Sequence, residues 1–275
     1  MRKLTEQEIK QHEMNILLEL QRICNENDLK FYLAYGTLLG AVRHRGFIPW
    51  DDDVDVIMSR PDYNKLIQLN RRSKIFHDGY KMLCGEDGTL YLPYMKIIDT
   101  STKVVEDYLN NEADQSLWVD VFPMDGISGE SSEIEKILKK TRYYRRLLFW
   151  NYVRLDYKGT SLPRRIAKIF AVAYARNVGA RKCKEKILKL AAETPYESAE
   201  FVLDVVADEH RLMHVHGKAI PKAEYEKSTK VCFEGHSFDA MQDYDAYLKF
   251  YYGDYMTLPP ADKQVGHEMS VYGKD

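Results

Sequence analysis

Four aspartates within five residues constrain this chain more than any other feature. They lie in the segment Trp50-Asp-Asp-Asp-Val-Asp-Val56. Carboxylates this close repel one another, and a strand accepts them only if a cation compensates their charge. Asp53 and Asp55 are two residues apart, so both side chains leave the same face of an extended strand, while Val54 and Val56 point into the core. The pattern predicts an oxygen-ligand site for Mg²⁺ or Mn²⁺, with a solvated acidic turn as the alternative.

A third carboxylate is expected from a neighbouring strand. Asp120 lies between apolar residues in the strand-like run Leu117-Trp-Val-Asp-Val-Phe-Pro123. An acid in such a run costs free energy unless it binds a metal or another cation. We therefore predict that Asp53, Asp55 and Asp120 are the metal ligands. Asp125, two residues after the proline, either supports the metal ligands or forms a turn before Gly126, and we interpret it as a turn residue.

A phosphate-binding segment is predicted upstream of the aspartates. Residues 31–40 have the pattern of a strand, a glycine, a hydroxyl residue and a helix start. Gly36 lets a ligand approach the backbone, and the free N–H groups of the helix start, with Thr37, favour an anion. Arg43 and His44 add cationic donors that suit a diphosphate. Neither a Walker loop nor a dinucleotide fingerprint is present.

The distribution of strand and helix patterns predicts an α+β fold. An amphipathic helix is expected over residues 5–28, with Thr5 and Glu8 as a capping box. Further elements are a helix over 61–72 and strands over 29–35, 54–58, 92–98 and 117–122. These elements do not alternate regularly, which argues against a doubly wound parallel sheet. We divide the chain into a core (1–130), a basic helical subdomain (131–220) and a C-terminal segment that returns to the core (221–275).

The helical subdomain contains most of the positive charge. Residues 139–189 hold 16 Lys or Arg and two acids, although the net charge of the whole chain is −2. Basic helices interleaved with aromatic residues suit an anionic surface. Membrane headgroups fit better than nucleic acid, because no nucleic-acid module is recognisable. The alternative is a solvated face that balances an acidic core.

Cysteine usage and hydropathy predict a cytoplasmic protein, peripherally associated with the inner face of the membrane. The four cysteines are far apart and include no CxxC pair, which argues against a disulfide framework or a zinc ribbon. The first residues lack the apolar stretch of a secretory signal. The longest uncharged apolar run in the middle of the chain, 169–175, is much shorter than the roughly 20 residues that cross a bilayer.

Several sequence blocks closely resemble the LicD family. The N-terminal blocks are Tyr35 to His44, Gly46 to Asp55 and Asp120 to Asp125, and the C-terminal ones are Phe233 to Gly235, Tyr244 to Leu248 and Tyr252 to Pro260. Met241 departs from the family pattern, which has a proline before the Asp-Tyr-Asp stretch. The resemblance implies a nucleotidyltransferase-like mixed β-sheet core flanked by helices. In this core Gly36-Thr37 would occupy the position of the superfamily's Gly-Gly/Ser turn. It also makes Asp53, Asp55 and Asp120 the three acids of that superfamily's metal site.

The resemblance further implies transfer of phosphocholine from CDP-choline to a hydroxyl of a cell-surface glycan, as a teichoic acid or lipopolysaccharide precursor, with release of CMP. Asp53 and Asp55 would hold the metal, and Asp120 would orient or deprotonate the acceptor hydroxyl. Arg43, His44 and Lys96 would bind phosphate oxygens. The alternative for Lys96 is an exposed lysine on an edge strand.

Other activities on the same scaffold stay open. The donor could carry a polyol-phosphate, a sugar-phosphate or a nucleotidyl group, because acids around a metal recognise phosphate rather than the transferred group. A different class of function is an inactive protein that binds membranes or an anionic polymer.

Aromatic and histidine side chains supply the remaining candidates. A quaternary ammonium is recognised by aromatic faces, and Trp50 is a candidate for this role, with packing as its alternative. His267 lies in the tail that the resemblance covers. His210 and His214 have the i,i+4 spacing of zinc ligands, with His216 nearby, but the glutamate of an HExxH motif is missing. Surface or partly buried histidines are the favoured interpretation of this cluster.

Overall fold

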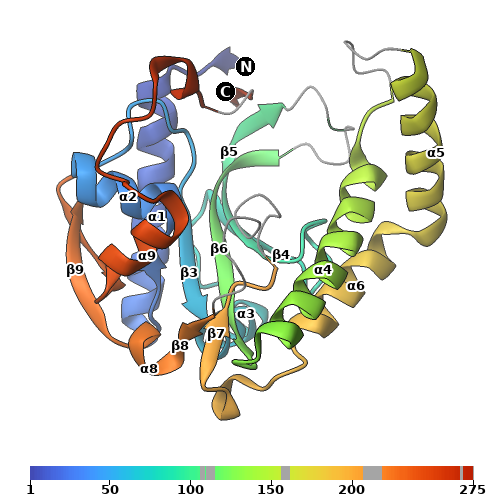
Figure 1. The fold of residues 1–275 in the computed structure, drawn as a ribbon. Coiled ribbons are helices and arrows are strands. Elements are labelled where there is room, and N and C mark those ends of the chain that lie inside the picture. Colours follow the sequence, from blue (N-terminus) through green and yellow to red (C-terminus); the bar gives the residue numbers. More distant parts are fainter. Residues whose placement is uncertain (106–108, 110–114, 156–161, 207–218, 267–268, 275) are drawn as a thin grey trace.

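The computed structural model describes residues 1–105, 109, 115–155, 162–206, 219–266 and 269–274. Its centre is a mixed sheet with helices on both faces (Figure 1). The main strand order is β1-β11-β5-β6-β3-β2, with β4 also on β5 and with β7 and β8 extending from β6. The strands are β1 (Arg2–Lys3), β2 (Tyr32–Leu33), β3 (Asp55–Ser59), β4 (Tyr80–Cys84), β5 (Met95–Val105), β6 (Gln115–Ile127), β7 (Phe201–Leu203), β8 (Ile220–Pro221) and β11 (Ser270–Gly273).

Helices surround this sheet, and a separate hairpin follows α8. The helices are α1 (Glu6–Glu26), α2 (Tyr35–His44), α3 (Arg60–Arg72), α4 (Ser131–Tyr152), α5 (Leu162–Val178), α6 (Ala180–Ala191), α8 (Lys222–Tyr225) and α9 (Tyr244–Tyr252). The hairpin consists of β9 (Ser228–Phe233) and β10 (His236–Met241). The expected mixture of strands and helices around a mixed sheet is confirmed. No helix of the described residues is long and apolar enough to span a bilayer.

The predicted N-terminal helix and its capping box are confirmed in α1. The Glu8 N–H donates to the Thr5 hydroxyl, and the Glu8 side chain accepts from the Thr5 N–H. A His12 ring nitrogen lies 2.7 Å from the carboxylate of Asp99 on β5. Asp99 shares a face with its register partner Leu117, and period-two alternation adds Val119 to that face. Helix α1 therefore covers this face of the sheet.

Helices α4, α5 and α6 pack on one another around a second group of buried apolar side chains. In Figure 1 they lie across the sheet from α1, α2 and α9. The break before α6 occurs at Gly179, whose φ of 89° favours glycine.

The β9–β10 hairpin holds the loop that leads into the aspartates. Its turn contains Glu234 and Gly235, both with positive φ. The Glu234 carboxylate accepts the Phe47 N–H at 3.0 Å, and the Phe233 ring packs 4.9 Å from the Phe47 ring. The Glu234 N–H donates to the Arg45 carbonyl. A segment far along the chain thus fixes the start of the acidic loop.

Candidate functional site

Sheet register brings three of the predicted site residues into one row. In the parallel pair β3–β6, Asp55 lies opposite Asp120. In the antiparallel pair β5–β6, Lys96 lies opposite the same Asp120. Neighbouring strands are about 4.8 Å apart, so the three side chains stand side by side on one face. This face is opposite the one that α1 covers.

The row is buried and its charges are unequal. Asp55, Asp120 and Lys96 are each less than a tenth exposed. Lys96 Nζ lies 3.2 Å from Asp120 Oδ1 and 3.4 Å from the centre of the Trp118 ring, whose Nε1 donates to Asp120 Oδ2. Burial raises the pKa of Asp120 to about 6; Lys96 opposes this shift and Asp55 adds to it. The burial of Lys96 excludes the exposed-edge alternative, and two carboxylates facing one lysine favour a further cation.

The raised pKa of Asp120 predicts a stability that depends on pH when no divalent cation is bound. An unfolded aspartate has a pKa of about 3.9. Between about pH 4 and pH 6 the folded chain holds a proton that the unfolded chain has released, so the free energy of unfolding falls as pH rises. This stabilisation amounts to up to about 3 kcal/mol. It is fully present below about pH 4 and is lost above about pH 6.

Urea unfolding in EDTA at pH 5 and pH 7.5 measures this effect. Asp120→Asn is expected to make the free energy of unfolding depend less steeply on pH. Some dependence should remain, because burial also raises the pKa of Asp125 to about 6. The comparison uses slopes rather than absolute stabilities, since the variant also removes the ion pair with Lys96. An unchanged slope would contradict the protonation of Asp120.

Asp53 is placed differently from the other two acids. It precedes β3 and is half-buried, in a loop with Asp51 and Asp52. In the described part of the chain, no three His, Cys, Asp or Glu side chains are close enough together to hold a metal. The residues present fit a site with two protein carboxylates, Asp55 and Asp120. Mg²⁺ commonly binds in this way and completes its shell with water and substrate phosphate.

The start of α2 holds the acidic loop. The backbone N–H of Asp55 donates to the Thr37 hydroxyl at 2.8 Å, which fixes the beginning of β3. A Cβ at Gly36 would lie 2.7 Å from an Asp51 carboxylate oxygen, so only glycine allows this approach. The positive end of the helix dipole stabilises such a carboxylate. Gly36 and Thr37 thus organise the acids, whereas their phosphate-binding role stays a prediction.

Arg43 and His44 lie at the other end of α2, roughly 10 Å along the helix from Thr37. Arg43 donates to the Tyr255 carbonyl at 2.7 Å and so ties the C-terminal segment to α2. Burial and the neighbouring Arg43 lower the pKa of His44, whose ring is edge-on to Trp50 at 6.3 Å. Trp50 itself packs against the main core.

The neighbour of His267 contacts the acidic loop, although His267 itself lies outside the described residues. A Cβ at Gly266 would be 2.8 Å from the Trp50 carbonyl oxygen and 3.1 Å from an Asp52 carboxylate oxygen. Gly266 therefore lies against the acidic loop. The His210, His214 and His216 cluster is likewise outside the described residues.

Glu13 on α1 is a site neighbour that the sequence interpretation missed. Its side chain is buried, and within the described residues its Oε2 has no hydrogen-bond partner. Burial raises the pKa of Glu13 well above its usual range, and the charges of Asp53, Asp52 and Asp51 raise it further. The sequence contains a signal for it, because Glu13 is four residues after Ile9 and four before Leu17, within the apolar face of the helix.

The interpretation of Asp125 as a turn residue was wrong. It lies within β6, buried, and accepts from Arg60 Nε at 2.6 Å. Arg60 Nη1 also donates to Glu86, which in turn accepts from the Tyr63 hydroxyl. A lone acid in an apolar run is here compensated by an arginine from α3, which the sequence pattern could not identify.

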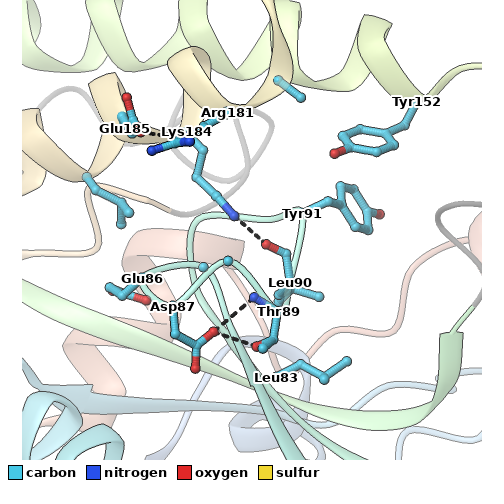
Figure 2. Close-up of a pocket in the computed structure, with 14 residues that line it drawn as sticks. Leu83, Glu86, Asp87, Thr89, Leu90, Tyr91, Tyr152, Arg181, Lys184 and Glu185 are labelled. Carbon is cyan, nitrogen blue, oxygen red and sulfur yellow. Dashed lines mark hydrogen bonds and ion pairs between the residues drawn. The ribbon is translucent and has the colours of Figure 1, made fainter.

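A hollow of about 660 Å³ lies between α6 and the loop that joins β4 to β5 (Figure 2). Lys184 crosses it to donate to the Leu90 carbonyl, and Asp87 accepts from the Thr89 backbone and side chain. Tyr91 and Tyr152 pack together at one end. None of the described residues lining it is one of the predicted site residues. The hollow is therefore separate from the row of Asp55, Asp120 and Lys96.

Comparison with known proteins agrees with the sequence blocks. Residues 28–163 match the family model described as "LicD/FKTN/FKRP, nucleotidyltransferase domain". The chain is 29% identical to the lipopolysaccharide cholinephosphotransferase LicD of Haemophilus influenzae over 274 residues, which cover 98% of each chain. Shorter matches occur with uncharacterized proteins of Rickettsia typhi (34% over 76 residues, 26% of this chain and 25% of the relative) and Rickettsia prowazekii (39% over 54 residues, 20% of each). Residues 28–163 therefore form a LicD-family domain.

Proposed function

We propose that this protein is a phosphotransferase that moves phosphocholine from CDP-choline to a hydroxyl of a lipopolysaccharide precursor and releases CMP. The observation that carries the proposal is the buried row of Asp55, Asp120 and Lys96, in which two carboxylates face one lysine. The match to the Haemophilus influenzae enzyme extends over nearly all of both chains, which supports the choice of transferred group and acceptor.

We assign the metal site to Asp55 and Asp120, in a core of nucleotidyltransferase type. When bound, Mg²⁺ or Mn²⁺ supplies positive charge to the diphosphate. Thr37 holds the backbone of Asp55, and Lys96 holds the carboxylate of Asp120. Asp120 also orients the acceptor hydroxyl or accepts its proton.

The remaining predicted residues are assigned to the substrates. Asp53 completes the acidic loop beside the metal, and Gly36 at the α2 start faces the donor phosphates. Arg43 and His44 contact the outer part of the donor. Trp50, which directly precedes the loop aspartates, and His267 are also assigned to the substrates. The acceptor is carried by a lipid, and we therefore also propose that the protein attaches peripherally to the cytosolic face of an anionic membrane.

A panel of nucleotide donors tests the transferred group. The purified protein is incubated with Mg²⁺, a lipopolysaccharide precursor and CDP-choline, CDP-polyol or UDP-sugar, and the nucleoside monophosphate released is measured by chromatography. We expect CMP from CDP-choline alone, with none in EDTA. Release of a nucleoside monophosphate from another donor would show that the protein transfers that donor's group instead of phosphocholine. No release from any donor would favour an inactive binding protein.

A further inference from the structure

Helix α5 has an apolar stripe that no part of the described structure covers. Its members recur at the i, i+3, i+4, i+7 and i+8 spacing of one helical face, and all are exposed, Phe170 by 71%. We call them the α5 stripe: Ile166, Ile169, Phe170, Ala173 and Tyr174. Exposed apolar residues gathered on one face, unlike scattered ones, indicate an interaction surface.

The fold does not need this stripe. Helix α5 packs on α4 and α6, and Ala175 belongs to the buried apolar group that the three helices share; Val172 is buried as well. In Figure 1, α5 lies at the outer edge of the helical subdomain, away from the sheet. Helix α5 is therefore apolar on two sides, and only the inner one supports folding.

The apolar surface continues onto α4. The Tyr143 hydroxyl lies 2.8 Å from the Tyr174 hydroxyl, so the two helices present their tyrosines together. Phe149, on the same helix as Tyr143, is about half exposed. Tyrosines are well suited to the boundary between headgroups and acyl chains, because the ring is apolar and the hydroxyl remains wet.

Charge complementarity identifies the partner. Residues 162–178 contain four cations and no acid, and those with described side chains are Arg165, Lys168 and Arg176. In a symmetric dimer the same basic residues would face each other and repel, which disfavours a second copy. A nucleic acid would match the charge but not the apolar stripe. A bilayer with anionic lipids matches both.

We propose that the α5 stripe is the membrane-docking face of this protein and lies in the headgroup region of an anionic bilayer. The inference deepens the peripheral attachment proposed above and rests on it for the location of the acceptor. The surface itself depends only on α4 and α5, so it would stand if a different group were transferred. It also separates two roles in the chain, with attachment on α5 and chemistry on the sheet.

Flotation with vesicles tests the docking face. The full chain is mixed with phosphatidylglycerol–phosphatidylethanolamine vesicles or with phosphatidylcholine vesicles, and the bound fraction is measured. We expect binding to the anionic vesicles, weakened roughly tenfold by Ile169→Ser with Phe170→Ser. Arg165→Glu with Arg176→Glu should weaken it roughly thirtyfold or more, since each basic residue near an anionic surface contributes about fivefold.

Matched controls separate this face from general apolarity and charge. Met256→Ser with Leu258→Ser removes similarly exposed apolar side chains elsewhere, and Arg71→Glu with Lys81→Glu reverses two exposed charges on the core. Both should bind vesicles like the wild type. Binding lost equally in the controls, or unchanged in the α5 variants, would overturn the proposal. So would light scattering that shows a dimer, made monomeric by the stripe variant, without vesicle binding.

Hydrolysis of soluble CDP-choline keeps this test independent of the proposed activity. All four variants should hydrolyse it at the wild-type rate, because none changes the sheet row. Vesicle binding without any donor turnover would contradict the proposed function and leave the docking face intact. Turnover without vesicle binding would contradict the docking face and leave the proposed function intact.

Discussion

Replacing Asp55 by asparagine is expected to lower the turnover of the nucleotide donor by about 10³-fold or more, because it removes one of the two carboxylates that hold the metal. The fold should persist, since asparagine has nearly the same shape and the backbone N–H of residue 55 still donates to Thr37. The thermal midpoint in EDTA should stay the same or rise, because the charge of Asp55 raises the pKa of its neighbour Asp120 and disfavours its ionised form. A variant of equal or greater stability without activity separates chemistry from folding.

Asp239→Asn is the matched control for this experiment. Asp239 lies on β10 and pairs with Lys230 at 2.8 Å, on the hairpin rather than in the row. Its variant should keep wild-type turnover. Isothermal titration with Mn²⁺ gives a second measurement: we expect the wild type and Asp239→Asn to bind and Asp55→Asn to bind much more weakly. Full turnover by Asp55→Asn would refute the metal assignment.

Arg60→Met is expected to lower the free energy of unfolding by about 3–5 kcal/mol, the largest loss of stability that we predict for a single substitution. Arg60 holds two carboxylates, Asp125 at 2.6 Å and Glu86 at 3.0 Å, and its guanidinium lies 4.9 Å from the centre of the Tyr63 ring. Methionine fills a similar volume but leaves Asp125 buried without its cation. Urea unfolding at pH 7.5 measures the change.

Arg181→Met is the control, because Arg181 pairs with Glu185 at 2.8 Å but its side chain is 90% exposed. An exposed ion pair of this kind contributes only about 0.3–0.5 kcal/mol. The double variant Arg60→Met with Asp125→Asn should recover part of the lost stability, since it also removes the buried charge. Equal effects of Arg60→Met and Arg181→Met would show that burial does not determine the strength of this pair.

The parts of the site that could be predicted are those encoded by local spacing. Alternation around Asp55 and Asp120 indicates buried acids on strands, and Thr5 with Glu8 indicates the start of α1. The order of the strands is not local, and it alone places Lys96 beside Asp120. The same holds for the partner of Asp125, since an acid in an apolar run gives no indication of which distant cation compensates it.

Short elements were also beyond the sequence pattern. The strand expected over 29–35 is reduced to Tyr32–Leu33, because Tyr35, with a φ of 47°, already begins α2. Strand β4 (Tyr80–Cys84) was not predicted, because its sequence Tyr-Lys-Met-Leu-Cys lacks a clear alternation of polar and apolar residues. Both depend on pairing with strands that lie elsewhere in the chain.

The pairing of β1 with β11 has a consequence for synthesis on the ribosome. Arg2 lies opposite Gly273, and β11 in turn pairs with β5 along Thr102 to Val105. Because a chain emerges from its amino end, this edge of β5 stays open until residues 270–273 have left the exit tunnel. An uncovered edge is a template for wrong partners, so the nascent chain needs protection until β11 has emerged. We expect the sheet to be completed only once β11 has been synthesised and has reached the edge of β5.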